Sequence, residues 1–540
     1  MENSGLLQKL EELLMEDTDA NVVANALTTI SEIYGENDSR LTNVKMISAL
    51  VKKIRDFGEL QQHLVCKLVY NYAKNNANLL DDSVKFEWMN ELESRVSSPN
   101  SAIALAASRA FLELTKTDFV THQKVYQRIK PSLLTLATAQ TSGQETSSVV
   151  WAHLRLLAMR VPILFCTDYK SFYVRAQSDS FTIKKLKVKT LALIADQHNY
   201  EQIVLELLEY CDDVDETFSS LALNAIGSIA RHQGLIEEAR VRVTEKICEL
   251  LLTKSDTTIH NNNKAKNNIR AESLHEIGLV LRTSSISSSS SSKEEEEKLC
   301  CEAISKLLEH FHFSVPDIFP SSQSSFSSND DFGDEIAGFG RRIMKARISL
   351  IWILGEFGEK IALAPYALET LVENLSEEIN PSIRLETFAS CVKLFLKRAP
   401  EMRNIFEECL ISCAKDIDPR VRNYSRIHGN ACLSDPRLLD ASSVKTTTKT
   451  TKTTKTIGGD YFAEEMEEKE RFQKLFEEID TLSIMYEMCG SKFTNYDNKN
   501  NGVSSYANNN NNNNDEKTAH KQALDQETSL LSFEEDIDLI

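Results

Sequence analysis

The sequence repeats a pair of amphipathic helical segments joined by a short polar turn. Ile383 and Val421 occupy corresponding places in two successive pairs, 38 residues apart. Each pair exposes an apolar face that only a neighbouring pair can cover, and a period near 40 residues is typical of HEAT and armadillo repeats. We therefore predict an all-α fold, a HEAT/armadillo-type α-solenoid of stacked helical hairpins.

Little in the sequence favours a sheet. Only 17 glycines and 10 prolines occur among 540 residues, and no alternating pattern typical of a strand runs for more than a few residues. A parallel sheet with a cofactor-binding crevice is therefore not expected. The hydrophobic content of 41% is enough for a substantial helical core.

Three glycines lie in the middle of predicted helices, at Gly227, Gly278 and Gly355. Glycine inside a helix costs roughly 1 kcal/mol relative to alanine. A phosphate-binding loop would place its glycines between a strand and a helix and follow them with Lys-Ser/Thr, which this sequence does not do. We interpret the three glycines as points where adjacent helices approach closely.

Shifts in composition suggest domain boundaries. We expect a helical trunk over residues 1–437, with disordered serine-rich insertions near 283–298 and 320–335. A low-complexity linker should follow at 438–460, then an amphipathic helix at 461–490 and a disordered, asparagine-rich acidic tail at 491–540. The predicted helix places apolar side chains at helical spacing, namely Phe472, Leu475, Phe476, Ile479 and Leu482.

Charge and cysteine usage exclude several classes. A net charge of −19 argues against a duplex nucleic-acid binder, so we expect no nucleic-acid partner. The start of the chain lacks the basic residues of a signal peptide, and the most apolar run, Ile348 to Leu354, is too short to cross a bilayer. The eleven cysteines show no zinc spacing and are interpreted as buried free thiols.

No catalytic motif is found, so we expect no enzyme activity, no catalytic residues, no metal and no cofactor. Two basic clusters interrupt the acidic background. Either could contact anionic lipid headgroups, or it could be a solvated helix face paired with acids, and both interpretations remain open. The clusters are Lys184, Lys185, Lys187 and Lys189, and Arg341, Arg342, Lys345 and Arg347.

Several segments carry a family resemblance. Residues 171–231, 347–375 and 390–401 resemble the trunk of beta adaptins, the beta-type large subunits of heterotetrameric adaptor protein (AP) complexes. Residues 19–33 resemble an earlier repeat of that trunk, and residues 482–493 its junction with the hinge. Within the family, the beta subunit of the fourth adaptor complex looks closest.

The resemblance implies a non-catalytic coat subunit in vesicle-mediated protein transport, which assembles with a second large, a medium and a small subunit. It also implies a cytoplasmic protein, peripheral on trans-Golgi network or endosomal membranes, that sorts cargo. We expect no counterpart here of the family's first repeats and folded C-terminal ear, so binding of accessory proteins by an ear is not expected. Either the sequence is truncated at its start or a partner covers the apolar face of its first hairpin. A karyopherin-like transport receptor or another HEAT scaffold is the alternative, and an enzyme is a third class.

Two interaction surfaces follow from the resemblance. The concave side of the later repeats, around Trp352, Phe388 and Phe395, is expected to dock a partner subunit. All three side chains could instead belong to the core, which is the favoured interpretation for Trp352. The tail ends in "SLLSFEEDIDLI" and matches a clathrin-box pattern. Clathrin binding would use an extended peptide whose apolar side chains enter grooves on the partner. The motif residues are Leu530, Leu531, Phe533 and Glu534.

Overall fold

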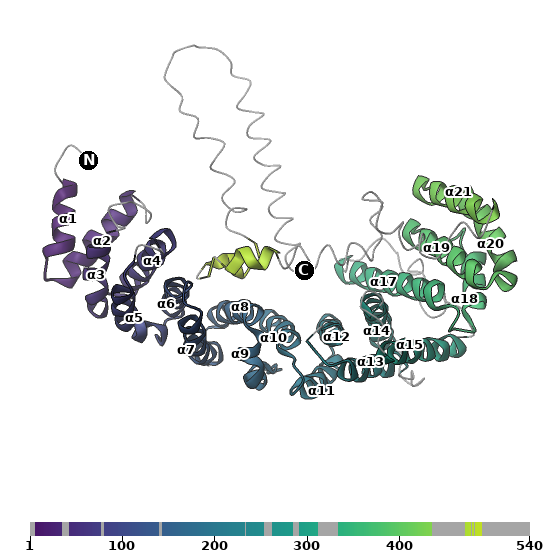
Figure 1. Ribbon diagram of the computed structural model, residues 1–540, viewed down its shortest axis with the longest axis horizontal. Coiled ribbons are helices and arrows are strands. Elements are labelled where there is room, and N and C mark those ends of the chain that lie inside the picture. Colours follow the sequence, from purple (N-terminus) through teal and green to yellow (C-terminus); the bar gives the residue numbers. More distant parts are fainter. Residues whose placement is uncertain are drawn as a thin grey trace, which may run out of the picture. The chain divides into compact units, whose positions relative to one another are not determined.

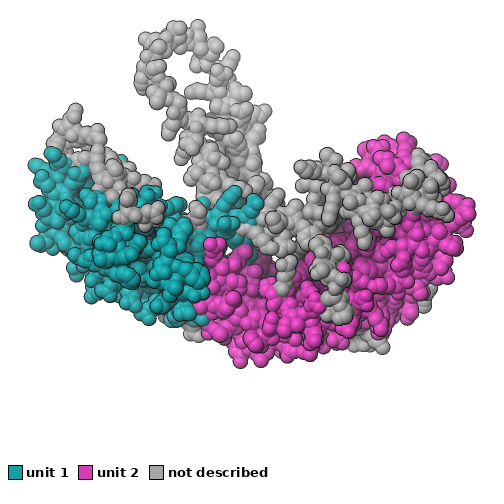
Figure 2. Space-filling view, viewed as in Figure 1, with its two compact units in different colours: residues 1–156, 466–540 teal, residues 157–465 magenta. Residues whose placement is uncertain are grey.

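The structure is a computed structural model, and it describes most of the helical part of the chain. The described ranges are 6–34, 43–76, 80–139, 143–232, 234–252, 262–284, 291–311, 333–434 and 470–488, without 477 and 480. Every regular element in these ranges is a helix, as predicted. The described residues form two compact units, residues 1–156 with 466–540 and residues 157–465 (Figure 2).

The first unit is a run of helical hairpins (Figure 1). The first helices α1, α3 and α5 pack in succession, and so do the second helices α2, α4 and α6. This is the two-layer packing of a helical-repeat protein. The helices of this unit are α1 (Leu6–Glu16), α2 (Ala20–Tyr34), α3 (Val44–Lys52), η2 (Ile54–Asp56), α4 (Glu59–Asn76), α5 (Asp82–Val96), α6 (Ser101–Leu114), α7 (Phe119–Thr138) and most of α8 (Gln144–Arg160).

The second unit continues the same plan. One layer consists of α10, α12, α14, α17, α19 and α21, each packed on the next, and the other layer includes the packed pairs α13–α15 and α18–α20. Its helices are α9 (Pro162–Phe165), η3 (Cys166–Phe172), α10 (Phe181–Ile194), α11 (Tyr200–Cys211), α12 (Glu216–Ala230), α13 (Glu237–Leu251), α14 (Asn262–Ser284), α15 (Ser291–His310), α17 (Gly333–Phe357), α18 (Ala364–Glu373), α19 (Pro381–Lys397), α20 (Ala399–Ala414) and α21 (Pro419–Ser434).

Short polar side chains begin the second helices of the hairpins. Asn100, Asp215 and Asn380 each accept a hydrogen bond from the backbone N–H two residues further on. Asp418 does the same for Arg420 at 2.8 Å, so the cap recurs 38 residues after Asn380. Such caps satisfy N–H groups that a helix start leaves without a partner, which is why these turns end where they do.

The mid-helix glycines lie where neighbouring second helices meet. A Cβ atom added at Gly278 of α14 would lie 2.9 Å from the Ser349 Cβ of α17. One added at Gly355 of α17 would lie 2.7 Å from the Ser390 Cα of α19. At Gly227 of α12 it would overlap the side chain of Glu276. The packing interpretation of these three glycines is confirmed.

The expected disordered insertion at 283–298 is wrong in its second half. Helix α15 begins at Ser291, so the acidic run at 294–297 is helical. Glu296 is buried and accepts a hydrogen bond of 3.0 Å from the Thr244 hydroxyl of α13, while Glu297 pairs with Lys360. These contacts hold a charged segment in the array. The other expected insertion, 320–335, lies outside the described residues except for the backbone of the first turn of α17.

The amphipathic helix expected at 461–490 is shorter in the described residues. Helix is present at 470–476, and turns with η5 (Leu482–Ile484) follow. Phe472, Leu475, Ile479 and Ile484 are nevertheless all buried. Of the five predicted apolar side chains, Phe476 is only half-buried and that of Leu482 lies outside the described residues, so the pattern predicted three buried side chains but not the backbone that carries them. The linker at 438–460 and the tail at 491–540 lie outside the described residues.

Candidate interaction surfaces

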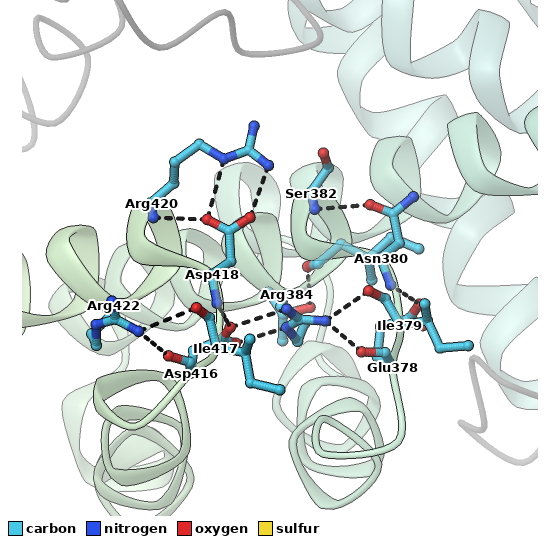
Figure 3. Close-up of polar contacts among 12 residues, drawn as sticks. Glu378, Ile379, Asn380, Ser382, Arg384, Asp416, Ile417, Asp418, Arg420 and Arg422 are labelled. Atoms are coloured by element: carbon cyan, nitrogen blue, oxygen red, sulfur yellow. Dashed lines mark hydrogen bonds and ion pairs between the residues drawn. The ribbon is translucent and has the colours of Figure 1, made fainter.

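A ladder of arginine–carboxylate pairs joins successive hairpins of the second unit. Arg347 of α17 pairs at 2.6 Å with Glu378, which lies in the turn before α19. Asp416 lies in the turn before α21. Arg384 of α19 donates from Nε and Nη2 to its two carboxylate oxygens, at 2.7 and 3.0 Å (Figure 3). Both pairs are largely buried, and the second is the bidentate geometry in which arginine binds a carboxylate most strongly.

Arg384 and Arg422 also bind the turns that precede their own helices. Arg384 Nη1 donates to the carbonyl oxygens of Glu378 and Ile379 at 2.6 and 2.8 Å. Arg422 Nη1 donates to the carbonyl oxygens of Asp416 and Ile417 at 2.6 and 3.2 Å, 38 residues further on (Figure 3). This ladder was not predicted from the sequence. Its signal is the recurrence of "INPSIR" at 379–384 as "IDPRVR" at 417–422.

Exposed apolar side chains flank the ladder. Ile379 and Ile417 hold the same place in their turns and are 71% and 93% exposed. Val214, in the turn before α12, is 97% exposed. β-branched apolar side chains repeated at one edge of the array are available to a partner without any change in the fold.

Helix α21 is basic in an acidic protein. It carries Arg420, Arg422 and Arg426 and no acidic residue. Arg420 hydrogen-bonds Asp418 and lowers the pKa of that carboxyl to about 2. Arg426 is exposed, and Ile427 beside it is 67% exposed. The described part of the second unit thus ends on a basic helix with an exposed apolar side chain.

The four lysines of the first basic cluster do not share one surface. Lys187 is buried and donates to Asp179 Oδ2 at 2.6 Å and to the Tyr173 carbonyl oxygen at 3.2 Å. Burial lowers the pKa of Lys187, while Asp179 opposes that shift. Lys187 therefore cannot contact a lipid headgroup in this structure. Lys184, Lys185 and Lys189 are half-buried.

The second basic cluster, on α17, also turns largely inward. Arg347 belongs to the ladder, and Arg342 donates to the Ser220 hydroxyl at 2.6 Å. Arg341 and Lys345 are exposed. Two of the four cations therefore stabilise the array, and only two face solvent.

Buried ionisable groups gather on α14 beside this cluster. Burial and the nearby Glu276 raise the pKa of Glu272 to about 7. Glu276 pairs with Arg231, which directly follows α12, and burial raises the pKa of Glu276 as well. Burial, with the cations around it, lowers the pKa of His275 to about 3, and its Nδ1 lies 3.1 Å from the Ser349 hydroxyl. His275 is therefore neutral near pH 7.

The aromatic residues expected to face a partner differ in position. Phe388 is buried and packs with Phe406, so it belongs to the core. Phe395 is half-buried and stacks on Phe406 at 4.7 Å between ring centroids. Trp352 is half-buried beneath the guanidinium of Arg282, 4.6 Å from its ring centroid. Of the three, Trp352 and Phe395 keep part of their surface accessible.

In the first unit, residues 470–488 pack against α8. The guanidinium of Arg155 lies 4.7 Å from the centroid of the Phe472 ring and pairs with Glu487, 332 positions away in sequence. The backbone of Glu487 has a φ of 51°, a conformation that costs a residue with a side chain about 1 kcal/mol or more. The contacts with Arg155 hold that conformation in place. No local sequence pattern indicates this pair.

Metal and thiol chemistry have little support among the described residues. No group of three histidine, cysteine or acidic side chains there is arranged to hold a metal ion. Of the nine cysteines whose side chains the structure describes, all but the half-buried Cys166 are buried. Burial raises the pKa of the Cys211 thiol to about 12, which suppresses the reactive thiolate.

Two further expectations concern membranes and the tail. No described helix combines the length and apolar character of a membrane span. The clathrin-box-like residues Leu530, Leu531, Phe533 and Glu534 lie outside the described residues.

Comparison with known proteins adds named relatives. Beta-adaptin-like protein A of Arabidopsis thaliana is 27% identical over 501 residues, covering 91% of this chain and 51% of the relative. AP-4 complex subunit beta of Dictyostelium discoideum is 26% identical, covering 90% and 54%. AP-1 complex subunit beta-1 of Mus musculus is 25% identical, covering 81% and 40%. The chain spans about half the length of these relatives.

A family model described as Adaptin N terminal region matches residues 1–271. That range is half of the chain and includes all the described helices from α1 to α13. It also contains Arg155 and the lysine cluster of α10. The chain therefore belongs to the adaptin N terminal region family.

Proposed function

We propose that this protein is a beta-type large subunit of an adaptor complex, a non-catalytic coat component in vesicle-mediated protein transport. The observation that carries the proposal is the adaptin family match over residues 1–271, together with relatives named as beta-type adaptin subunits. The stacked hairpins support it, because a helical-repeat array offers long surfaces for other subunits.

The expected partners are a second large, a medium and a small adaptor subunit. We propose that the half-buried Trp352 and Phe395 contribute to the surface that docks the medium subunit. Affinity purification of the full chain from its own cells tests this proposal. Recovery of those three subunits in similar amounts is expected. Recovery of a Ran-type GTPase or nuclear-pore repeats instead would favour a karyopherin-like receptor and overturn it.

We also propose a finer assignment, in which the chain is the beta subunit of the fourth adaptor complex and acts in the cytoplasm on trans-Golgi network or endosomal membranes. The relative from Dictyostelium discoideum named as an AP-4 subunit supports it. The identity of the co-purified medium subunit tests the subtype. Imaging of the tagged chain against Golgi and endosomal markers tests the location.

Peripheral membrane contact is proposed for the half-buried lysines Lys184, Lys185 and Lys189. Each cation near an anionic surface contributes up to about 1 kcal/mol. Flotation with phosphatidylserine vesicles should fall several-fold when the three are changed to glutamine. The exposed Lys415 offers a control substitution elsewhere in the second unit. Equal flotation of both variants would contradict the proposal.

Clathrin binding is proposed for the tail motif. Residues 526–540 carry five acids and no lysine or arginine, which suits a basic groove. A peptide spanning Gln526 to Ile540 should bind the clathrin heavy-chain terminal domain. Changing Leu530, Leu531 and Phe533 to alanine should abolish binding. No binding by the unaltered peptide at high micromolar concentration would refute this proposal without affecting the assignment as an adaptor subunit.

A further inference from the structure

Arg422 is the third arginine of the arginine–carboxylate ladder, and no carboxylate of the described residues binds it as Asp416 binds Arg384. In Arg384, Nη1 binds two carbonyl oxygens of its own turn, while Nε and Nη2 bind Asp416 of the next turn. Arg422 makes the same two carbonyl contacts through Nη1. No described residue accepts a hydrogen bond from its Nε or Nη2 (Figure 3). The equivalent position at Arg384 holds a carboxylate.

The surface around Nε and Nη2 of Arg422 suits an acidic partner. Arg420 and Arg426 lie on the same helix, which has no acidic residue. Ile417, whose carbonyl oxygen Arg422 binds, exposes 93% of its surface and offers apolar contact beside that guanidinium. Planar bidentate capture of a carboxylate is the interaction for which a guanidinium is best shaped.

The sequence immediately after α21 does not supply the missing carboxylate well. Residues 435–459 contain five basic and only two acidic residues. Their charge therefore opposes docking on three arginines. An acidic group from another polypeptide is the better complement.

We propose that the exposed surface around Arg422 and Arg426, in the N-terminal half of α21, is a docking surface for an acidic turn of a partner protein. Nε and Nη2 of Arg422 receive one carboxylate of that turn, as Arg384 receives Asp416. Arg426, one helical turn after Arg422, contacts a neighbouring acid, and Ile417, whose carbonyl oxygen Arg422 binds, packs against the apolar residues of the turn. This inference goes beyond the assignment as a coat subunit and does not depend on which complex the chain joins.

Zero-length cross-linking can identify the docked carboxylate directly. Arg422→Lys in the full chain places an amine where a carbodiimide can join it to a carboxylate in contact. After purification from the native cells with partners bound, mass spectrometry should find the cross-link on an aspartate or glutamate of another polypeptide. Arg403→Lys is the control, because Arg403 is an exposed arginine of α20 that pairs within its own helix. It should give no cross-link to that polypeptide.

Charge reversal gives an independent readout. Arg426→Glu should reduce retention of the cross-linked polypeptide at least tenfold, whereas Arg403→Glu should leave it within twofold. No described residue hydrogen-bonds Arg426, so this variant tests the surface without breaking the turn that Arg422 binds. Unfolding midpoints of both variants close to that of the parent chain would show that the array is intact.

Several results would overturn the inference. A cross-link to the chain's own acidic run at 464–468, or to a second copy of the chain, would assign a different occupant. Loss of binding to phosphatidylserine vesicles without any carboxylate cross-link would assign the surface to lipid. Unchanged retention by Arg426→Glu would show that the surface is not used. None of these results bears on the recovery of adaptor subunits, so the two proposals fail separately.

Discussion

Replacing Gly355 with alanine should destabilise the second unit, although alanine is the better helix former. Gly355 lies inside α17, where alanine would by itself gain about 1 kcal/mol. Its added Cβ would lie 2.7 Å from Ser390 Cα, an atom of the α19 backbone. A side-chain rotation cannot relieve that contact, so the two helices must separate.

The expected cost follows from these contacts. Ordinary van der Waals contact begins at 3.4 Å, so the helices must move apart by at least about 0.7 Å. Overpacking of this kind costs about 1–3 kcal/mol. The movement also strains the 2.8 Å hydrogen bond from the Ser390 hydroxyl to the Ile351 carbonyl oxygen, with a net contribution of about 1 kcal/mol. After the gain in helix propensity, the net destabilisation is about 1–3 kcal/mol.

The same helix offers a matched control. A Cβ added at Gly340 meets nothing within 4 Å, so Gly340→Ala should stabilise the chain by up to about 1 kcal/mol. Urea unfolding followed by circular dichroism should move the midpoints of the two variants in opposite directions. Hydrogen exchange should place the loss in α17 and α19. A Gly355→Ala chain as stable as the parent would refute the close-packing argument.

Three further predictions concern buried charges and the docked segment. Burial raises the pKa of Glu272 from 4.5 to about 7, so the folded chain binds this proton more tightly than the unfolded chain does. The free energy of unfolding that the proton contributes is lost as the pH rises through about 7. The free energy of unfolding of Glu272→Gln, relative to that of the parent chain, should therefore rise between pH 5 and 8, by up to about 3 kcal/mol at pH 8. A difference that stays constant with pH would contradict this. Lys187→Met leaves the largely buried carboxylate of Asp179 without its ion-pair partner, with only the Arg175 backbone N–H bound to it among the described residues, and should cost up to about 3 kcal/mol in urea unfolding, which a second change, Asp179→Leu, should largely restore. Phe472→Ala should speed protease cleavage within residues 470–488 several-fold, and unchanged cleavage would show that this side chain does not hold the segment.

Much of the array could be predicted from local patterns. Helix period, the polar turns and the 38-residue recurrence all depend on residues close in sequence. The mid-helix glycines could be interpreted for the same reason, because their cost within one helix implies a compensating neighbour. The amino-acid sequence by itself therefore determined the all-α repeat fold and the sites of close helix packing.

Tertiary structure alone decided which charged side chains face inward. Lys187 lies in a row of lysines, yet only the way the loop before α10 folds back on that helix places Asp179 and the Tyr173 carbonyl group beside it. The acidic run of α15 is held in the array because Thr244 of α13 and Lys360 of the turn after α17 bind it. Arg155 and Glu487 are 332 positions apart and meet only because residues 470–488 return to α8. Whether a charged residue is buried depends on partners that the tertiary fold supplies, and local sequence patterns do not indicate those partners.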